Sequence, residues 1–227
     1  MPRSEFPTEA PGHRHDRPEV EVTVAPLGLR GTLVRPEHGR GLVLFAHGSG
    51  SSRLSPRNRF VAERLHRAGL GTLLFDLLRD DEAADRRNVF DISFLAERLA
   101  LATDWVRSEA DLGGVPIGYF GASTGAAAAL VADTITHHAI AAIVSRGGRP
   151  DLAGVALPRV RAPTLLVVGG QDFGVIELNR EALARLACEK RLEIVPGAGH
   201  LFEEPGALDR VVALARDWFV PRLSAEA

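Results

Sequence analysis

Cysteine is almost absent from this sequence of 227 residues, and the single thiol, Cys188, excludes an intrachain disulfide. Long apolar runs are missing as well, because no window approaches the roughly 18 consecutive apolar residues of a membrane span. The first residues also lack the apolar core of a signal peptide. These absences favour a cytoplasmic protein with no membrane partner.

Charge of one sign is not in excess, since 27 Lys and Arg residues face 29 Asp and Glu residues, for a net charge of −2. No basic field therefore attracts nucleic acid, and we expect a small-molecule substrate. Residues 1–18 are rich in proline, charge and histidine, and they predict a flexible leader. Their histidines do not have the spacing of metal ligands, so neither a metal nor a cofactor is expected. The sequence leaves the oligomeric state open.

Two patterns of apolar residues predict the fold. The alternating segments 19–25 and 29–36 are typical of an antiparallel hairpin. Six later runs are short and continuously apolar, as in strands buried on both faces, at residues 41–47, 69–78, 115–123, 139–145, 162–170 and 191–197. Helical patterns lie between them, with Ser55 and Asp91 as N-caps. The alternation predicts one α/β domain over residues 19–227, with a mostly parallel central sheet and helices on both faces.

A serine surrounded by very small residues follows one of these runs, in "GASTG". Gly121, Ser123 and Gly125 form the G-x-S-x-G pattern of a sharp turn between a strand and a helix. At such a turn the serine backbone is strained, and a Cβ two residues away on either side would collide with it. The pattern predicts an exposed nucleophile at the start of a helix.

A serine hydroxyl needs a base, and the base needs a group that orients it. Asp172 follows a buried strand in "LLVVGGQDFG", and His200 lies in a glycine-rich loop after the last strand. The order Ser123, Asp172, His200 matches the order of a hydrolase triad on this architecture. Two alternatives stay open: Asp172 as a helix cap, and His200 as a solvated loop residue.

The loop "FAHGSGSS" follows the first continuous strand. Backbone amides in such a loop, together with the amide after the nucleophile, stabilise the oxyanion of acyl transfer. We predict Thr124 and Ser49 as these donors, with Gly50 as the alternate. His47 is interpreted as a structural residue that orients the loop. A plain turn or a phosphate-binding loop remains an alternative, although no lysine follows as in a P-loop.

Five segments, in order, are together similar to one known family: "LFAHGSGSS", "GYFGASTGAAAAL", "VSRGGRPDLAG", "APTLLVVGGQD" and "VPGAGHLFEEPG". From about residue 20 to 220 the chain resembles the α/β-hydrolase superfamily, most closely its dienelactone-hydrolase-like branch. The resemblance implies Ser123, His200 and Asp172 as the triad, with Ser49 and Thr124 as oxyanion donors. Dienelactone hydrolases carry cysteine as nucleophile, whereas this elbow carries serine and Cys188 lies in a predicted helix. Relatives with these motifs are sometimes joined to phosphoribosyltransferase domains, for which the 227 residues leave no length.

The remaining expectations concern the substrate. The segment 146–162 is too short for more than a crossover, so we predict an open site without a lid domain. Arg146 and Arg149 are interpreted as a solvated turn, with attraction of an anionic acyl group as the alternative. His66 is expected on a solvent face, and the acidic segment 79–87 on the surface, with a contribution to the rim of the pocket as the alternative. The leading hypothesis is a serine hydrolase of small esters, lactones or thioesters; the alternatives are a non-catalytic binding protein and an amide hydrolase.

Overall fold

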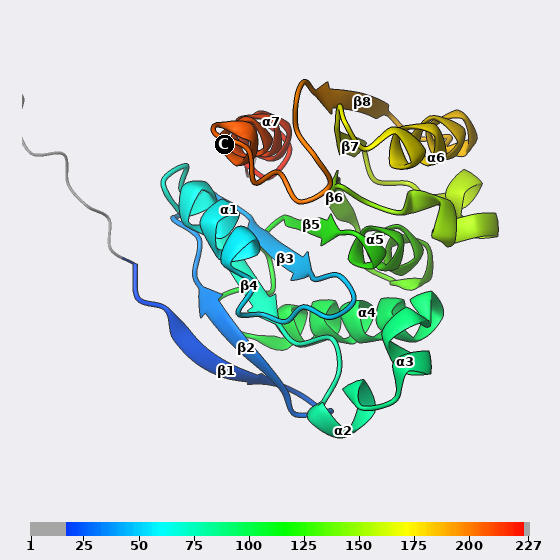
Figure 1. Cartoon of the computed structure of the whole chain (residues 1–227). Helices are drawn as coiled ribbons and strands as arrows, with labels where there is room; N and C mark the ends of the chain where they lie inside the picture. Colours follow the sequence, from blue (N-terminus) through cyan, green and yellow to red (C-terminus); the bar gives the residue numbers. More distant parts are fainter. Residues whose placement is uncertain (1–16, 225–227) are drawn as a thin grey trace, which may run out of the picture.

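The computed structural model describes residues 17–224, which form an eight-stranded sheet with helices on both faces (Figure 1). The strands are β1 (Val20–Val24), β2 (Leu29–Val34), β3 (Leu42–Ala46), β4 (Gly71–Phe75), β5 (Ile117–Ala122), β6 (Ile140–Arg146), β7 (Thr164–Gly169) and β8 (Lys190–Val195). The helices are α1 (Pro56–His66), α2 (Asp80–Ala83), α3 (Arg86–Phe90), α4 (Ile92–Ser108), α5 (Thr124–Ile135), α6 (Phe173–Arg185) and α7 (Ala207–Phe219), with a 3-10 segment, η1 (Pro150–Arg159). The predicted α/β class and the predicted strands are confirmed.

The strand order is β1-β2-β4-β3-β5-β6-β7-β8. The hairpin β1–β2 is antiparallel and joins β4 in antiparallel fashion, whereas β4, β3, β5, β6, β7 and β8 all run parallel. The carboxyl ends of the parallel strands therefore meet at one edge of the sheet, where open α/β folds build their sites. The loops after β3, β4, β5, β6, β7 and β8 all start there.

Two apolar layers hold the helices on the sheet. On one face α1 and α7 pack over a cluster that includes Phe45, Phe120 and Phe219. On the other face α4, α5, η1 and α6 cover a second cluster, which includes Leu44 and Tyr119 (Figure 1). Continuous apolar strands are needed because both faces of the central strands are covered. The buried Tyr119 hydroxyl is satisfied by Thr103 at 2.6 Å.

The predicted helix starts are confirmed by their caps. Ser55 Oγ accepts a hydrogen bond from the Asn58 amide at 3.4 Å, and Pro56 occupies the first turn of α1. Asp91 likewise accepts from the Phe94 amide at 3.0 Å and begins α4. Each cap satisfies an amide that has no partner inside the helix.

Some expectations about exposure are wrong. Strand β8 lies at the edge of the sheet and is largely exposed, so it is not buried on both faces. Helix α6 ends at Arg185, which leaves Cys188 in the connection to β8 rather than in a helix. His66 is half-buried rather than placed on a solvent face: its Nε2 lies 2.7 Å from Thr72 Oγ1, and burial, with the nearby Arg17, lowers its pKa to about 4.

Arg17 and Pro18, at the end of the expected leader, are within the described part of the chain, and Arg17 contacts the fold. The Arg17 guanidinium donates hydrogen bonds to the carbonyl oxygens of Gly69 and Leu70, both at 3.1 Å, after the end of α1. Residues 1–16, with the histidines of the leader, lie outside the described part of the chain.

The segment after β6 is compact, as predicted. Its η1 turn packs against α5 and α6, and no separate domain is inserted within residues 146–162. The segment 79–87 forms the exposed helix α2 and the start of α3. Within residues 17–224, no helix has both the length and the apolar character that crossing a membrane requires.

Candidate active site

Ser123 lies at the turn between β5 and α5 with φ at 51°, a left-handed conformation that non-glycine residues rarely adopt. A Cβ on Gly121 would overlap Ala126, and one on Gly125 would overlap the Ala46 carbonyl oxygen. The glycines are therefore required by close approach of backbone, as expected, but the backbone is that of Ala126 and Ala46 rather than that of Ser123. The turn is also held from β6, since the Arg149 amide donates to the Ser123 carbonyl at 3.1 Å.

Asp172 and His200 lie in contact, although they are far apart in the sequence. Asp172 Oδ2 is 2.6 Å from His200 Nδ1, so Nδ1–H donates to the carboxylate and Nε2 is left as the acceptor. Asp172 occupies the N-cap position of α6, but its side chain makes no capping hydrogen bond. The alternative interpretation of Asp172 as a helix cap is therefore wrong.

Backbone contacts between the two loops bring this pair together. The Gln171 amide donates to the Ala198 carbonyl at 2.9 Å, and a Cβ on Gly169 would overlap the Gly199 carbonyl oxygen. Phe202 is buried with φ at 56° and anchors the loop beyond His200. Sequence reasoning missed Gly169 and Phe202; the glycine pair before Gln171 was the only local signal of close packing.

Ser123 and His200 line the same cavity, of about 250 Å³, which we call the arginine cavity. Its lining residues are Gly48, Ser49, Ser51, Ser55, Arg57, Asn58, Ala122, Ser123, Arg146, Gly147, His200 and Leu201. No hydrogen bond joins Ser123 to His200 in the described part of the chain. Such bonds are often long before a substrate binds.

Arg146 is the deepest charge in this cavity, being only 6% exposed. Its Nη2 donates to Asn58 Oδ1 at 3.3 Å, and its Nε has no hydrogen-bond partner within residues 17–224. Burial, with the nearby Arg57, lowers its pKa to about 10, and no acidic neighbour in this range opposes that shift. Arg146 therefore stays positively charged at neutral pH, without a described counter-ion.

The interpretation of Arg146 as part of a solvated turn is wrong, because the end of β6 and the start of α1 bury it. Arg149 differs: its Nε and Nη2 donate to Asp151 at 2.9 and 2.8 Å, and it does not line the cavity. Sequence reasoning also missed Arg57 and Asn58. They lie in the first turn of α1, and nothing in the local sequence indicates that they line a cavity.

The two predicted oxyanion donors lie next to each other, in an arrangement that the sequence did not indicate. Thr124 is the first residue of α5, so its amide has no acceptor within the helix. The Ser49 amide donates to the Thr124 hydroxyl at 2.9 Å. In this state the Thr124 side chain therefore occupies one of the two donors. Gly48 fits tightly behind both, because a Cβ on Gly48 would lie 2.9 Å from Ser123 Cβ.

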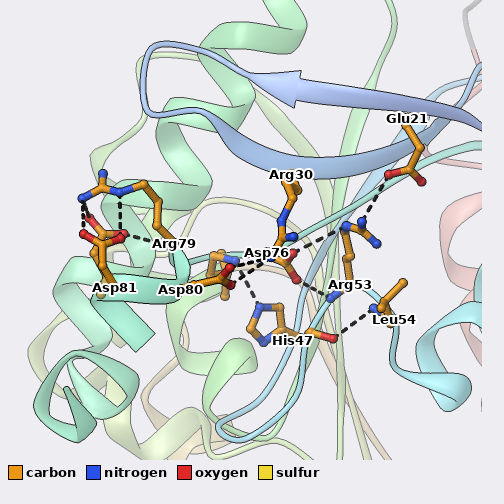
Figure 2. Close-up of polar contacts among 12 residues, drawn as sticks. Glu21, Arg30, His47, Arg53, Leu54, Asp76, Arg79, Asp80 and Asp81 are labelled. Carbon is orange, nitrogen blue, oxygen red and sulfur yellow. Dashed lines mark hydrogen bonds and ion pairs between the residues drawn. The ribbon is translucent and has the colours of Figure 1, made fainter. Parts of the chain in front are cut away.

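His47 holds the loop in place, as predicted. The Leu77 amide donates to its Nε2 at 3.1 Å, so the neutral ring carries its proton on Nδ1, which faces the Gly48 carbonyl at 3.1 Å (Figure 2). Burial lowers the pKa of His47, although the Gly48 carbonyl and Asp76 act in the opposite direction. The ring therefore links the loop after β3 to the end of β4.

A second cavity, of about 270 Å³, lies on the β4 side of the same loop, and we call it the leucine cavity. Its apolar lining comprises Leu54, Leu77, Leu78, Ala83, Val89 and Leu95. Its polar lining comprises Gly48, Ser49, Gly50, Ser51 and Ser52, together with Arg30, His47, Arg53, Asp76 and Asp80, which Figure 2 labels. Gly48, Ser49 and Ser51 border both cavities, whereas the alternate donor Gly50 borders only this one.

Comparison with solved structures gives a match along almost the whole chain. A dienelactone hydrolase from Anabaena variabilis is 55% identical, with a TM-score of 0.88, and the match covers 92% of this chain and 100% of that one. The chain belongs to the dienelactone-hydrolase-like α/β hydrolases. This member of the family carries serine at the elbow, as the sequence shows.

Two other matches are a distant solved structure with the same fold and a close relative that is a longer protein. An α/β serine hydrolase homologue from Coxiella burnetii is 18% identical with a TM-score of 0.72, over 94% of this chain and 99% of that one, which shows the shared fold. A Mycobacterium tuberculosis protein with the provisional name phosphoribosyl transferase is 56% identical over 205 residues, or 90% of this hydrolase-family chain. The chain spans about half the length (46%) of these curated relatives. No family model matches the sequence.

Proposed function

We propose that the chain is a serine hydrolase that cleaves a small carboxylic ester, lactone or thioester through an acyl group carried on Ser123. The observation that supports this most strongly is the pair of Asp172 and His200, 2.6 Å apart, at the edge of the cavity that Ser123 lines. A strained serine, an oriented imidazole and a carboxylate at one sheet edge are the parts that acyl transfer requires.

In this proposal Ser123 Oγ attacks the carbonyl carbon of the substrate and its proton passes to His200 Nε2. Asp172 stabilises the imidazolium through the Nδ1–H contact. When the tetrahedral intermediate collapses, the leaving alcohol or thiol takes that proton. Water then attacks the acyl-serine, gives one proton to Nε2, and the serine regains it as the acid departs. The carbon–oxygen or carbon–sulfur bond is broken with no change in oxidation state.

The Ser49 and Thr124 amides hold the oxyanion in this scheme. Because the Ser49 amide donates to the Thr124 hydroxyl in the free chain, the substrate oxygen takes the place of that hydroxyl. Each amide directed at a developing oxyanion lowers the barrier by about 3 kcal/mol in well-studied hydrolases.

Arg146 narrows the substrate class. An unpaired charge at this depth is destabilising by roughly several kcal/mol, and an anion within reach would offset that cost. The cavity also carries Arg57, which is paired with Glu203 at 3.0 Å. We therefore include an anionic group among the substrate features, placed in the arginine cavity.

The test is hydrolysis of 4-nitrophenyl acetate by the wild type and by Ser123→Ala. We expect release of nitrophenol to fall by about 10³-fold or more in the variant. Ser108→Ala, which removes an exposed hydroxyl at the end of α4, serves as the matched control and should keep the wild-type rate. Equal rates in Ser123→Ala and wild type would refute the assignment.

The alternatives make different predictions. A non-catalytic binding protein would show no labelling of Ser123 by a fluorophosphonate, whereas an activated nucleophile is labelled. An amide hydrolase would be labelled but would also cleave the nitroanilides that match the esters. We do not extend the phosphoribosyl transferase name of the mycobacterial relative to this chain, because the chain matches less than half of that protein.

A further inference from the structure

The leucine cavity is a second concave site beside the proposed nucleophile, on the opposite side of the loop after β3. Its apolar walls come from five separate segments: Leu54 of the loop before α1, the residues that follow β4, helix α2, helix α3 and the first turn of α4. An apolar hollow with a few fixed polar groups is the usual form of a small-molecule site. At about 270 Å³ it exceeds the 150 Å³ or so that accommodates a benzene ring.

The charges around its mouth are already paired with one another. Arg30 Nη2 lies 2.9 Å from Asp80 Oδ1, and Arg53 contacts Glu21 at 3.2 Å and Asp76 at 3.5 Å (Figure 2). The Arg53 amide also donates to Asp76 Oδ1 at 2.8 Å. These arginines hold the mouth in shape, whereas Arg146 in the other cavity lacks a counter-ion. The leucine cavity is therefore suited to an uncharged group.

The two cavities meet at the predicted oxyanion donors. Gly48 and Ser49 border both cavities, and Gly48 packs directly against Ser123. A carbonyl oxygen held by the Ser49 and Thr124 amides places its carbon beside Ser123 Oγ. In the binding mode proposed below, one substituent of that carbon extends past Gly48 and Ser49 towards each cavity.

The position of His200 decides which substituent enters which cavity. The leaving oxygen or sulfur must receive its proton from His200, so it has to face the imidazole. His200 borders the arginine cavity and does not border the leucine cavity. The leaving group therefore belongs to the arginine cavity, and the acyl side chain to the leucine cavity.

We propose that the leucine cavity is the acyl-binding pocket of this hydrolase and that it selects compact apolar acyl groups, such as a chain of four to six carbons or a phenyl ring. This inference rests on the proposed function and adds the orientation of the substrate. A charged acyl group is disfavoured there, and a fatty chain is too long for the volume.

Ala83 offers the cleanest way to test the pocket, because it is exposed on α2 and lines the cavity, while the neighbouring exposed Ala84 does not. We compare Ala83→Trp with Ala84→Trp on 4-nitrophenyl acetate, butyrate, hexanoate, benzoate and dodecanoate. In the wild type we expect kcat/KM to rise towards hexanoate and to fall at dodecanoate. The ratio of hexanoate to acetate should drop about tenfold in Ala83→Trp and stay within about twofold in Ala84→Trp.

A second variant covers the case in which tryptophan disturbs α2. Leu54→Ala removes an exposed apolar wall, because Leu54 is 57% exposed, and should lower the same ratio about threefold. Fluorophosphonate labelling of Ser123 is measured in each variant. If Ser123 is labelled and esters are cleaved, but neither variant changes the ratio, the acyl assignment is overturned. If no ester is cleaved and Ser123 is not labelled, it is the proposed function that fails.

Discussion

The two cavities that flank the loop after β3 differ in how their charges are compensated. In the leucine cavity each arginine is paired with an acidic residue, and the walls are aliphatic. In the arginine cavity Arg146 is buried with only a long hydrogen bond to Asn58, beside Ser123 and His200. One side is thus equipped to exclude water from an apolar group, and the other to move protons and attract negative charge. The comparison implies that rate and acyl selectivity can be altered separately.

The largest effect is expected on the chemistry of the arginine cavity. Asp172→Asn should lower kcat by about 10³- to 10⁴-fold, because the amide no longer holds the imidazole as an acceptor at Nε2. The loss should be similar for acetate, hexanoate and benzoate esters, measured by initial rates. A loss that depends strongly on the acyl group would contradict the separation of the two cavities.

A smaller effect is expected from the buried charge. Arg146→Gln should reduce the preference for 4-acetoxybenzoate over its neutral methyl ester by about 10- to 30-fold in kcat/KM, because the carboxylate loses its partner. Arg149→Gln is the control, since Arg149 is paired with Asp151 outside the cavity. Equal behaviour of the two variants would refute the assignment of charge recognition to Arg146.

The loop between the cavities should be sensitive to acid through His47. Its pKa is lowered in the folded chain by burial, so the unfolded chain takes up the proton first as pH falls below about 6.5. The contribution of the neutral His47 ring to the free energy of unfolding is therefore fully present above that pH and is lost progressively below it. His47→Asn should lower the free energy of unfolding by about 1–3 kcal/mol at pH 7.5, because the Leu77 amide loses its acceptor.

The same variant should also show a weaker fall in stability between pH 6.5 and 5 than the wild type, as followed by urea unfolding at each pH. An identical pH dependence in both proteins would show that His47 does not carry this effect. His66, whose pKa is also lowered, is unchanged in both proteins and cancels in the comparison.

The smallest effect is expected from the hydrogen bond between the Ser49 amide and the Thr124 hydroxyl. Thr124→Val removes the hydroxyl that the Ser49 amide contacts, and it should raise kcat/KM about three- to fivefold, since the substrate oxygen no longer replaces an existing partner. Thr124→Ser keeps the hydroxyl and should behave as the wild type. A lower kcat/KM in the valine variant would indicate that the hydroxyl positions the loop instead.

The sequence was most informative where a local pattern has one structural solution. Gly121, Ser123 and Gly125 predicted the strained elbow because such a turn brings backbone close to both glycines, that of Ala126 to Gly121 and the carbonyl oxygen of Ala46 to Gly125. The strands were predictable because the sheet is covered on both faces. The segment 191–197 was also predicted as a strand, but its exposure was not, since its composition does not reveal that β8 lies at the edge of the sheet.

The two cavities could not be predicted from local sequence patterns, because their linings come from segments that are far apart in the sequence. Arg146 and Arg149 are three residues apart in the same turn, yet Arg146 is buried against Asn58, 88 positions earlier, whereas the half-buried Arg149 pairs with Asp151. The leucines of the second cavity resemble ordinary core residues, because their shared surface appears only when β4 and α2–α4 come together. The Ser49–Thr124 contact likewise joins segments 75 residues apart.

The wall between the leucine cavity and the arginine cavity consists of only a few residues, from Gly48 to Ser51, and Gly48 packs against Ser123. A substitution in that wall changes the shape of both cavities and also displaces the proposed oxyanion donor Ser49. Substitutions in α2 and α3 change the leucine cavity alone, and substitutions around the end of β6 change the arginine cavity alone. Under the proposed function, the substrate range of this chain is therefore most readily changed through those outer walls rather than through residues 48–51.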